Sequence, residues 1–259
     1  MSQSVVLRGS VRYDKHPENF IGNVVKSIRS WFDGEIVIST WEGQEQFIDK
    51  NLEVDKVIFS PDPGPGPIQY WKRQVVSYQK GLNASSGSQV MVTRTDMIHN
   101  INPFQFLNTF QNSGSVLKVF DNKLLVSNMM TIRPDSDEYP NCFRICDWMQ
   151  VGSREDIFKW SDVLDHVLNL DTSKIGRLNC TETFWFLSVL KNKYPDFVDI
   201  YDSSDINHLA WEAIVNNFIV LDTKSMLGST NMNWQLQPEY CPCYLDHDTY
   251  LKLYDTVGQ

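Results

Sequence analysis

The sequence lacks the features of several large protein classes. Lys and Arg number 23 against 32 Asp and Glu, for a formal net charge of −9. Nucleic-acid binding is not expected, because neutralising a phosphate backbone needs an excess of cations. No apolar run approaches the roughly 20 residues that cross a bilayer. The first ten residues, MSQSVVLRGS, show no secretory pattern of a basic segment before an apolar one. We therefore expect a cytoplasmic protein.

Cysteine is also scarce. The five cysteines are Cys142, Cys146, Cys180, Cys241 and Cys243. Their odd number and wide spread favour free thiols over a disulfide framework. Cys241-Pro-Cys243 with His247 suggests a metal site, but the spacing is unlike the usual zinc patterns and a second cysteine pair is missing. We expect no zinc site.

The residues that are present predict a globular α/β protein. The chain is 42% apolar and 21% charged, which argues against disorder. Apolar spacing in the first ninety-six residues alternates between strand and helix. Strands are expected at 5–11, 35–40, 56–60 and around 90–92, and helices at 17–32, 42–52 and 68–80, the last stopped by Gly81. Such alternation predicts a mostly parallel central sheet with helices on both faces.

The second half of the chain is less regular. Helices are expected at 103–110, 154–168 and 181–194, strands at 123–132 and 141–148, a helix passing into a strand at 208–222, and loops beyond 225. There is no internal repeat and no long linker. We therefore expect one domain over 1–259, with a nucleotide-binding half at 1–100 and an acceptor-side half at 101–259.

Polar residues follow the predicted strands of the first half. Ligands collect at the carboxyl ends of parallel strands, so these residues are candidates for a binding site. They are Arg8, Gly9, Ser10, Thr40, Asp62, Arg94 and Asp96. Arg73 at the start of a predicted helix is a further candidate, because a guanidinium binds a phosphate bidentately.

The stretch QVMVTRTDM, residues 89 to 97, has two interpretations. Arg94 and Asp96 form a solvated ion pair at a strand end, or Asp96 holds a divalent cation while Arg94 contacts a phosphate or fixes Asp96. Mg²⁺ and Mn²⁺ prefer oxygen ligands of this kind. His99 and His247 are candidates for further ligands, although a lone histidine is more often structural.

Several stretches, taken together, resemble the WavE family of lipopolysaccharide-synthesis proteins. They are SIRSWFDGEIVISTWEG, VDKVIFSPDPGP, RQVVSYQKGL, VMVTRTDM and CDWMQVGSREDIFKW. The resemblance covers most of residues 5 to 190. It departs at Lys72, because an asparagine tends to precede the Arg-Gln pair that is Arg73-Gln74 here. The resemblance implies a GT-A-like glycosyltransferase fold and an activated sugar donor.

The resemblance also implies a function. GT-A enzymes place an Asp-x-Asp signature at a strand end to hold a metal against the donor diphosphate, and Arg94 replaces the first of these acids here. We expect a metal-assisted transfer, with Mn²⁺ or Mg²⁺, from a nucleotide sugar such as a UDP-hexose to a glycan or lipid-linked glycan of the bacterial surface. The lack of a membrane segment leaves loose, peripheral attachment to the inner membrane open. A sugar nucleotidyltransferase and a non-catalytic sugar-binding or assembly protein are the alternatives.

Asp147, Trp148 and Glu182 are candidates for the acceptor side. An indole stacks on a sugar face, and a carboxylate removes the proton of the acceptor hydroxyl in an inverting transfer. Each has an ordinary structural explanation as well. Asp147-Trp148 suits a strand end beside a core, and Glu182 suits the first turn of a helix because of the macrodipole. Inverting and retaining routes both stay open.

Overall fold

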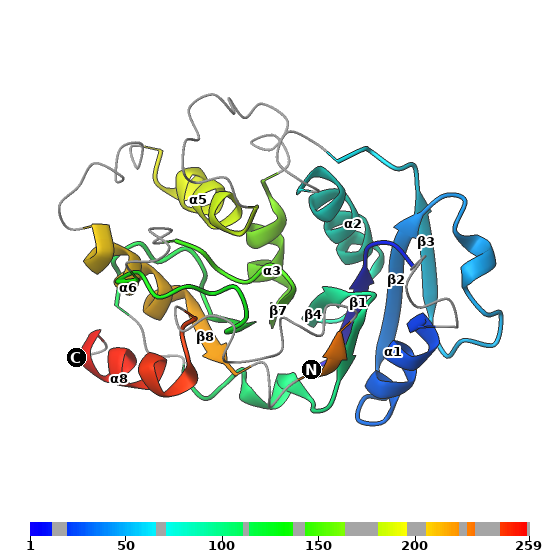
Figure 1. Cartoon of the computed structure of the whole chain (residues 1–259), viewed down its shortest axis with the longest axis horizontal. Helices are drawn as coiled ribbons and strands as arrows, with labels where there is room; N and C mark the ends of the chain where they lie inside the picture. Colours follow the sequence, from blue (N-terminus) through cyan, green and yellow to red (C-terminus); the bar gives the residue numbers. More distant parts are fainter. Residues whose placement is uncertain are drawn as a thin grey trace.

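The computed structural model describes residues 1–11, 20–65, 71–110, 114–136, 143–163, 181–195, 206–222, 227–230 and 244–257. Within these ranges one sheet has the strand order β3-β2-β1-β4-β7-β6-β8 (Figure 1). Its strands are β1 (Gln3–Arg8), β2 (Glu35–Trp41), β3 (Lys56–Ser60), β4 (Gln89–Arg94), β6 (Leu124–Ser127), β7 (Met149–Ser153) and β8 (Phe218–Leu221). Only β7 among them runs antiparallel to its neighbours. A second pair joins β5 (Met97–His99) to β9 (Leu227–Thr230).

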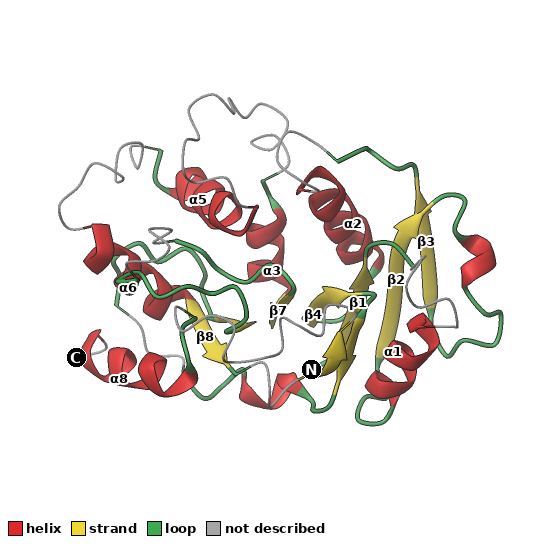
Figure 2. Cartoon of the chain, in the orientation of Figure 1, coloured by secondary structure: helices red, strands yellow, loops and turns green. Residues whose placement is uncertain are grey.

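Helices cover both faces of this sheet (Figure 2). The described helices are α1 (Phe20–Arg29), α2 (Trp71–Ala84), α3 (Arg154–Ser161), α5 (Thr181–Lys193), α6 (Ile206–Asn217) and α8 (His247–Val257), with short 3₁₀ turns at Glu45–Phe47 and Pro103–Phe106. None of the helices in the described ranges is both long enough and apolar enough to span a membrane.

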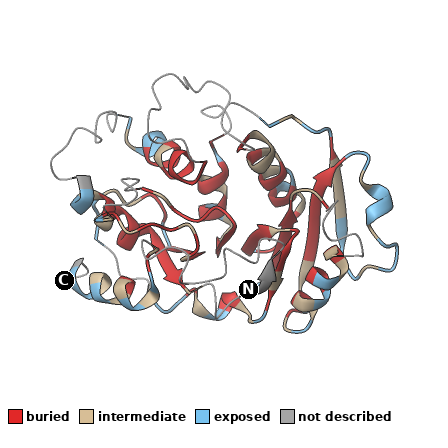
Figure 3. Cartoon of the chain, in the orientation of Figure 1, coloured by how far each residue is buried: buried red, intermediate tan, exposed pale blue. Residues whose placement is uncertain are grey.

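The alternation of side chains along β1 explains the two layers. Val5 and Leu7 face α1 in one apolar cluster, and Val6 faces α2 in the other, because successive side chains of a strand point to opposite faces. Buried residues therefore occupy the strands and the inner sides of the helices (Figure 3). The predicted α/β class, with a mostly parallel sheet between helices, is confirmed.

Several sequence predictions of elements were wrong. The helices expected at 42–52 and 103–110 are only 3₁₀ turns, at Glu45–Phe47 and Pro103–Phe106. Gly81 does not stop α2, which continues to Ala84; a Cβ at Gly81 would overlap Val6, so this glycine permits the helix to lie close to the sheet. The strand expected at 141–148 is instead β7, at 149–153. The loop-rich tail beyond 225 contains β9 and α8.

The segment before β7 is apolar without being a strand. Its backbone bonds to a loop, not to the sheet: the Cys146 N–H donates to the Thr131 hydroxyl at 3.0 Å, and the Arg144 carbonyl accepts from Ile132 N–H at 3.1 Å. Cys146 is a free, buried thiol. The other four cysteines, and with them the Cys241-Pro-Cys243 group, lie outside the described residues.

Candidate functional site

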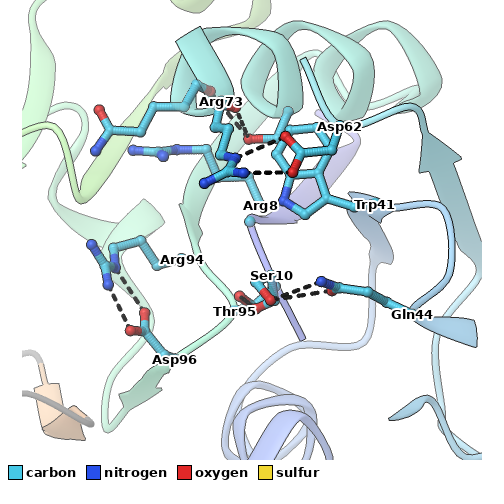
Figure 4. Close-up of a pocket in the computed structure, with 12 residues that line it drawn as sticks. Arg8, Ser10, Trp41, Gln44, Asp62, Arg73, Arg94, Thr95 and Asp96 are labelled. Atoms are coloured by element: carbon cyan, nitrogen blue, oxygen red, sulfur yellow. Dashed lines mark hydrogen bonds and ion pairs between the residues drawn. The ribbon is translucent and has the colours of Figure 1, made fainter. Parts of the chain in front are cut away.

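A cavity of about 430 Å³ lies at the carboxyl ends of β1, β2 and β4 (Figure 4). The loop after β3 and the first turns of α2 complete its wall. The lining residues are Arg8, Gly9, Ser10, Trp41, Gln44, Asp62, Arg73, Gln74, Ser77, Arg94, Thr95 and Asp96. The structure thus brings together seven of the eight residues that the sequence predicted for donor binding, with Thr40 outside the wall.

The chain leaves β1 by a turn that opens this cavity. Gly9 has φ +114°, which is strained for any residue with a side chain. Its N–H donates to the Ser39 carbonyl at 3.0 Å, and the Thr95 hydroxyl donates to the Ser10 carbonyl at 2.6 Å. The ends of β1 and β4 are therefore tied together where their side chains enter the cavity.

Each of the two carboxylates in the cavity wall is held bidentately by an arginine of the same wall. Arg94 donates from Nε to Asp96 Oδ1 at 2.7 Å and from Nη2 to Oδ2 at 2.6 Å. Arg73 donates from Nε to Asp62 Oδ1 at 2.8 Å and from Nη2 to Oδ2 at 2.6 Å. Figure 4 shows each guanidinium facing its carboxylate. Pairing with Arg73 holds the pKa of Asp62 below its usual value.

The third arginine, Arg8, is buried, with 3% of its surface exposed. Its guanidinium donates to the main-chain carbonyl of Asp147 and lies 3.8 Å from the Asp147 carboxylate. The rings of Tyr78 and Trp185 lie 5.6 and 5.8 Å from it. Burial lowers the pKa of Arg8, and Asp147 opposes that shift.

Asp147 lies behind the cavity wall and is 1% exposed. Neither of its carboxylate oxygens has a hydrogen-bond partner among the described residues. Burial raises the pKa of Asp147, while the positive charge of Arg8 acts in the opposite direction. Asp147 is thus a carboxylate held next to a cation with its hydrogen-bonding capacity unused, and its catalytic role stays a prediction.

Trp148 contacts an arginine of the cavity wall. Its ring lies 4.5 Å from the guanidinium carbon of Arg94, and the residue is 5% exposed. Two consecutive residues therefore contact two arginines of the cavity: Asp147 contacts Arg8, and Trp148 contacts Arg94. The geometry is that of a cation–π contact with Arg94, and stacking of this indole on an acceptor sugar stays a prediction.

Glu182, the second predicted base, begins the first turn of α5 and is 8% exposed. The guanidinium of Arg144 lies 3.8 Å from its carboxylate. Its carboxylate adds to the effect of burial in raising the pKa of Cys146 to about 12, as that of Asp147 does. Glu182 does not line the cavity, so its part in catalysis stays a prediction.

Sequence reasoning missed Gln44, which organises one side of the cavity. Its Oε1 accepts from the Val11 N–H at 2.8 Å and from the Thr40 hydroxyl at 2.9 Å, and its Nε2 donates to the Ser10 hydroxyl at 3.0 Å. Thr40 is fully buried, and its hydroxyl contacts the cavity wall through this bond to Gln44; its part in donor binding stays a prediction. No motif marks Gln44, because it follows β2 in an irregular loop.

One expectation about Asp96 was wrong. The side chain was expected to face solvent at a strand end, but Asp96 is 1% exposed. Both oxygens accept from Arg94. Asp96 is the second residue of the two-residue turn between β4 and β5.

The described residues do not fit a divalent cation. Both wall carboxylates are bound by arginines, and no group of three or more His, Cys, Asp or Glu in the described ranges is arranged to hold a metal. His99 is buried with its ring 3.2 Å from the Thr93 hydroxyl, and His247 Nδ1 lies 2.7 Å from the Val220 carbonyl. Neither histidine lines the cavity.

These observations define a class: an α/β protein whose binding cavity lies at the carboxyl ends of parallel strands and contains three arginines. The chain belongs to the WavE lipopolysaccharide synthesis family, whose model matches residues 3–257. The family resemblance predicted from the sequence is confirmed. No curated protein matches the chain.

Several solved structures are similar to this chain. The galactosyltransferase LgtC, in complex with donor and acceptor sugar analogs, is 8% identical with a TM-score of 0.45, covering 99% of this chain and 96% of that one. Glucosyl-3-phosphoglycerate synthase from Mycobacterium tuberculosis, in complex with Mn²⁺, uridine diphosphate and glucosyl-3-phosphoglycerate, is 18% identical with a TM-score of 0.37, covering 64% and 66%. HddC from Yersinia pseudotuberculosis is 13% identical with a TM-score of 0.37, covering 60% and 78%.

Proposed function

We propose that this protein is a glycosyltransferase that takes a sugar from a nucleotide-sugar donor, a UDP-hexose in the first instance, and transfers it to a bacterial lipopolysaccharide or related surface glycan. The observation that carries this proposal is the convergence of three guanidiniums in one cavity of an acidic chain. Guanidiniums bind phosphates in preference to neutral ligands. Membership in a lipopolysaccharide synthesis family supports a glycan as the acceptor.

The residues of the cavity wall suit both parts of such a donor. Arg8, Arg73 and Arg94 supply charge for the diphosphate. The indole of Trp41 and the side chain of Gln44 are the groups suited to a nucleoside, since a base stacks on an aromatic ring and bonds to an amide. Asp62 adds an acceptor for a ribose hydroxyl.

The carboxylates deeper in the molecule are the candidates for proton removal from the acceptor. Burial raises the pKa of Asp147, and a raised pKa brings a carboxyl group closer to the range useful for a general base at neutral pH. Glu182 is the second candidate. An acceptor hydroxyl must lose its proton as it attacks the anomeric carbon, whose bond to the diphosphate oxygen breaks.

The test is product analysis with a panel of UDP-, GDP- and CMP-linked sugars and lipopolysaccharide fragments as acceptors. We expect release of a nucleoside diphosphate together with a mass increase of one sugar on the acceptor. Arg94→Gln is expected to lose this activity. Arg133→Gln is the matched control, because Arg133 makes the same bidentate pair with Asp135 at an exposed position outside the cavity.

Two results would contradict the proposal. Formation of pyrophosphate from a nucleoside triphosphate and a sugar phosphate would identify a sugar nucleotidyltransferase. Tight binding of nucleotide sugars with neither hydrolysis nor transfer, across the whole acceptor panel, would identify a non-catalytic sugar-binding or assembly protein.

A further inference from the structure

We propose that the cavity binds the diphosphate of its ligand through Arg8, Arg73 and Arg94 without a divalent cation, and that Asp96 is the positioning residue for Arg94 and not a metal ligand. This inference rests on the proposed function for the identity of the ligand as a nucleoside diphosphate compound. In this arrangement the arginines of the chain supply the positive charge that a metal ion supplies in a metal-dependent diphosphate site.

The first argument is that the carboxylate oxygens of the cavity wall are already engaged. A divalent cation at Asp96 would have to displace two charge-assisted hydrogen bonds, of 2.6 and 2.7 Å, from Arg94. A cation at Asp62 would have to displace two from Arg73, of 2.6 and 2.8 Å. Charge-assisted bidentate pairs of this kind are the strong hydrogen bonds of proteins.

The second argument is the charge of the wall. The wall has three arginines and two aspartates, and Asp147 behind the wall is the counter-ion of Arg8. The carboxylates are therefore balanced by arginines, so the site lacks the excess of negative charge that attracts a dication, whereas a diphosphate meets three guanidiniums. Arg8 and Arg94 already affect each other, since the charge of Arg94 contributes to lowering the pKa of Arg8.

The third argument is the rigidity of the arginines. Arg94 is fixed by Asp96 on one edge and by the Trp148 ring on its face. Arg8 is fixed by the Asp147 carbonyl and by two aromatic rings. Pre-ordered donors reduce the entropy lost on binding.

The assignment of Asp96 follows from these contacts. An Asp-x-Asp signature has an acid at its first position, but that position here is Arg94, and the Asp96 carboxylate bonds to it. The tripeptide Arg94-Thr95-Asp96 therefore replaces a metal and its ligand by a cation and its counter-ion. Thr95 joins this unit to the β1 turn through its bond to the Ser10 carbonyl.

The experiment measures binding of UDP and of inorganic pyrophosphate to the full chain by titration calorimetry, once in excess EDTA and once in millimolar Mn²⁺. We expect the Kd of UDP to agree within about threefold between the two conditions. Mn²⁺ titrated alone, and with UDP, is expected to give no protein-bound signal in electron paramagnetic resonance beyond that of Mn²⁺–UDP itself.

The outcomes separate this inference from the proposed function. UDP that binds only with Mn²⁺ overturns the inference and leaves the function standing. Pyrophosphate that binds in EDTA while no nucleotide of the panel binds in either condition supports the arginine site and refutes the nucleotide-sugar function. Failure of every diphosphate compound in both conditions overturns both.

The UDP affinity of variants tests the same inference independently. Arg94→Gln is expected to weaken UDP binding in EDTA by about tenfold to a hundredfold, the worth of one charge-assisted contact, and Arg133→Gln is expected to leave it unchanged. Asp96→Asn is expected to weaken UDP binding by about threefold to tenfold, and by the same factor in EDTA and in Mn²⁺, because it breaks the bidentate pair that positions Arg94 and removes no metal ligand. A metal site predicts instead a loss of more than tenfold that appears only when Mn²⁺ is present.

Discussion

Arg8 and Arg94 are direct register partners at the carboxyl ends of the adjacent parallel strands β1 and β4. Two cations placed this close repel each other, so each needs a negative partner. Asp96 supplies it for Arg94 and Asp147 supplies it for Arg8. The pairing explains why the apolar strand β4 ends in an arginine, Arg94, and is followed two residues later by an aspartate, Asp96.

The buried state of Asp96 predicts a cost in stability. Asp96→Asn should lower the free energy of unfolding by about 1–3 kcal/mol, because it takes the charge from one partner of a bidentate pair that is largely covered. Urea denaturation measures this. Asp135→Asn, in the exposed pair with Arg133, is the control and should change stability by less than about 0.5 kcal/mol. Equal effects would mean that the Asp96 pair is no better shielded than the exposed one.

Trp148 should affect ligand affinity through Arg94. Trp148→Leu removes the ring beneath the guanidinium and should weaken UDP binding by about fivefold to thirtyfold, the equivalent of a desolvated cation–π contact. Trp148→Phe keeps a ring and should recover most of the affinity. Trp211→Leu on α6 controls for loss of an indole outside the site. Equal affinity in the Leu and Phe variants would remove the ring from the binding mechanism.

Asp147 and Glu182 are distinguished by turnover. If either is the general base, Asp147→Asn or Glu182→Gln should lower the rate of transfer by about 10² to 10⁴ with a smaller change in donor affinity. If Asp147 instead holds Arg8, its variant should raise the Kd of UDP and leave the pH dependence of kcat unchanged. Unchanged turnover in both variants would favour a retaining route or another base.

His99 predicts a loss of stability in acid. Burial lowers its pKa from 6.5 to about 3, so the folded protein keeps this ring neutral while the unfolded chain takes up a proton below about pH 6.5. Protons therefore favour the unfolded state, and the contribution amounts to about 2 kcal/mol at pH 5. Between pH 7.5 and 5, the free energy of unfolding of His99→Gln should therefore fall by about 2 kcal/mol less than that of the wild type. A slope identical to that of the wild type would show that His99 titrates normally.

Gly81 should be intolerant of a side chain. Gly81→Ala places a Cβ against Val6 and should cost about 1–3 kcal/mol through overpacking, despite the better helix propensity of alanine. The cost should fall when Val6→Ala is present, which a double-mutant cycle in urea would measure. Lys80→Ala, at an exposed position of the same helix, should be nearly neutral. Additive effects of the Gly81 and Val6 changes would contradict direct contact.

Local patterns in the sequence determined the elements and the edge of the sheet where the site lies. The apolar runs of β1, β2, β3 and β4 have a period and a length that leave little alternative, and polar residues at the carboxyl ends of parallel strands must meet at one edge. The family resemblance came from the same stretches. Prediction worked here because these properties depend on residues that are neighbours in the chain.

Only the tertiary structure decided what the charged residues of the site do. Asp96 pairs with Arg94 because of the way the chain turns after β4. The partners of Arg8 are Asp147, Tyr78 and Trp185, which are far from it in the chain. Gln44 entered the site from an irregular loop without any motif. A charge in a sequence can pair with many others, and the fold selects the partner, because the energy of an ion pair depends on distance and burial and not on sequence separation.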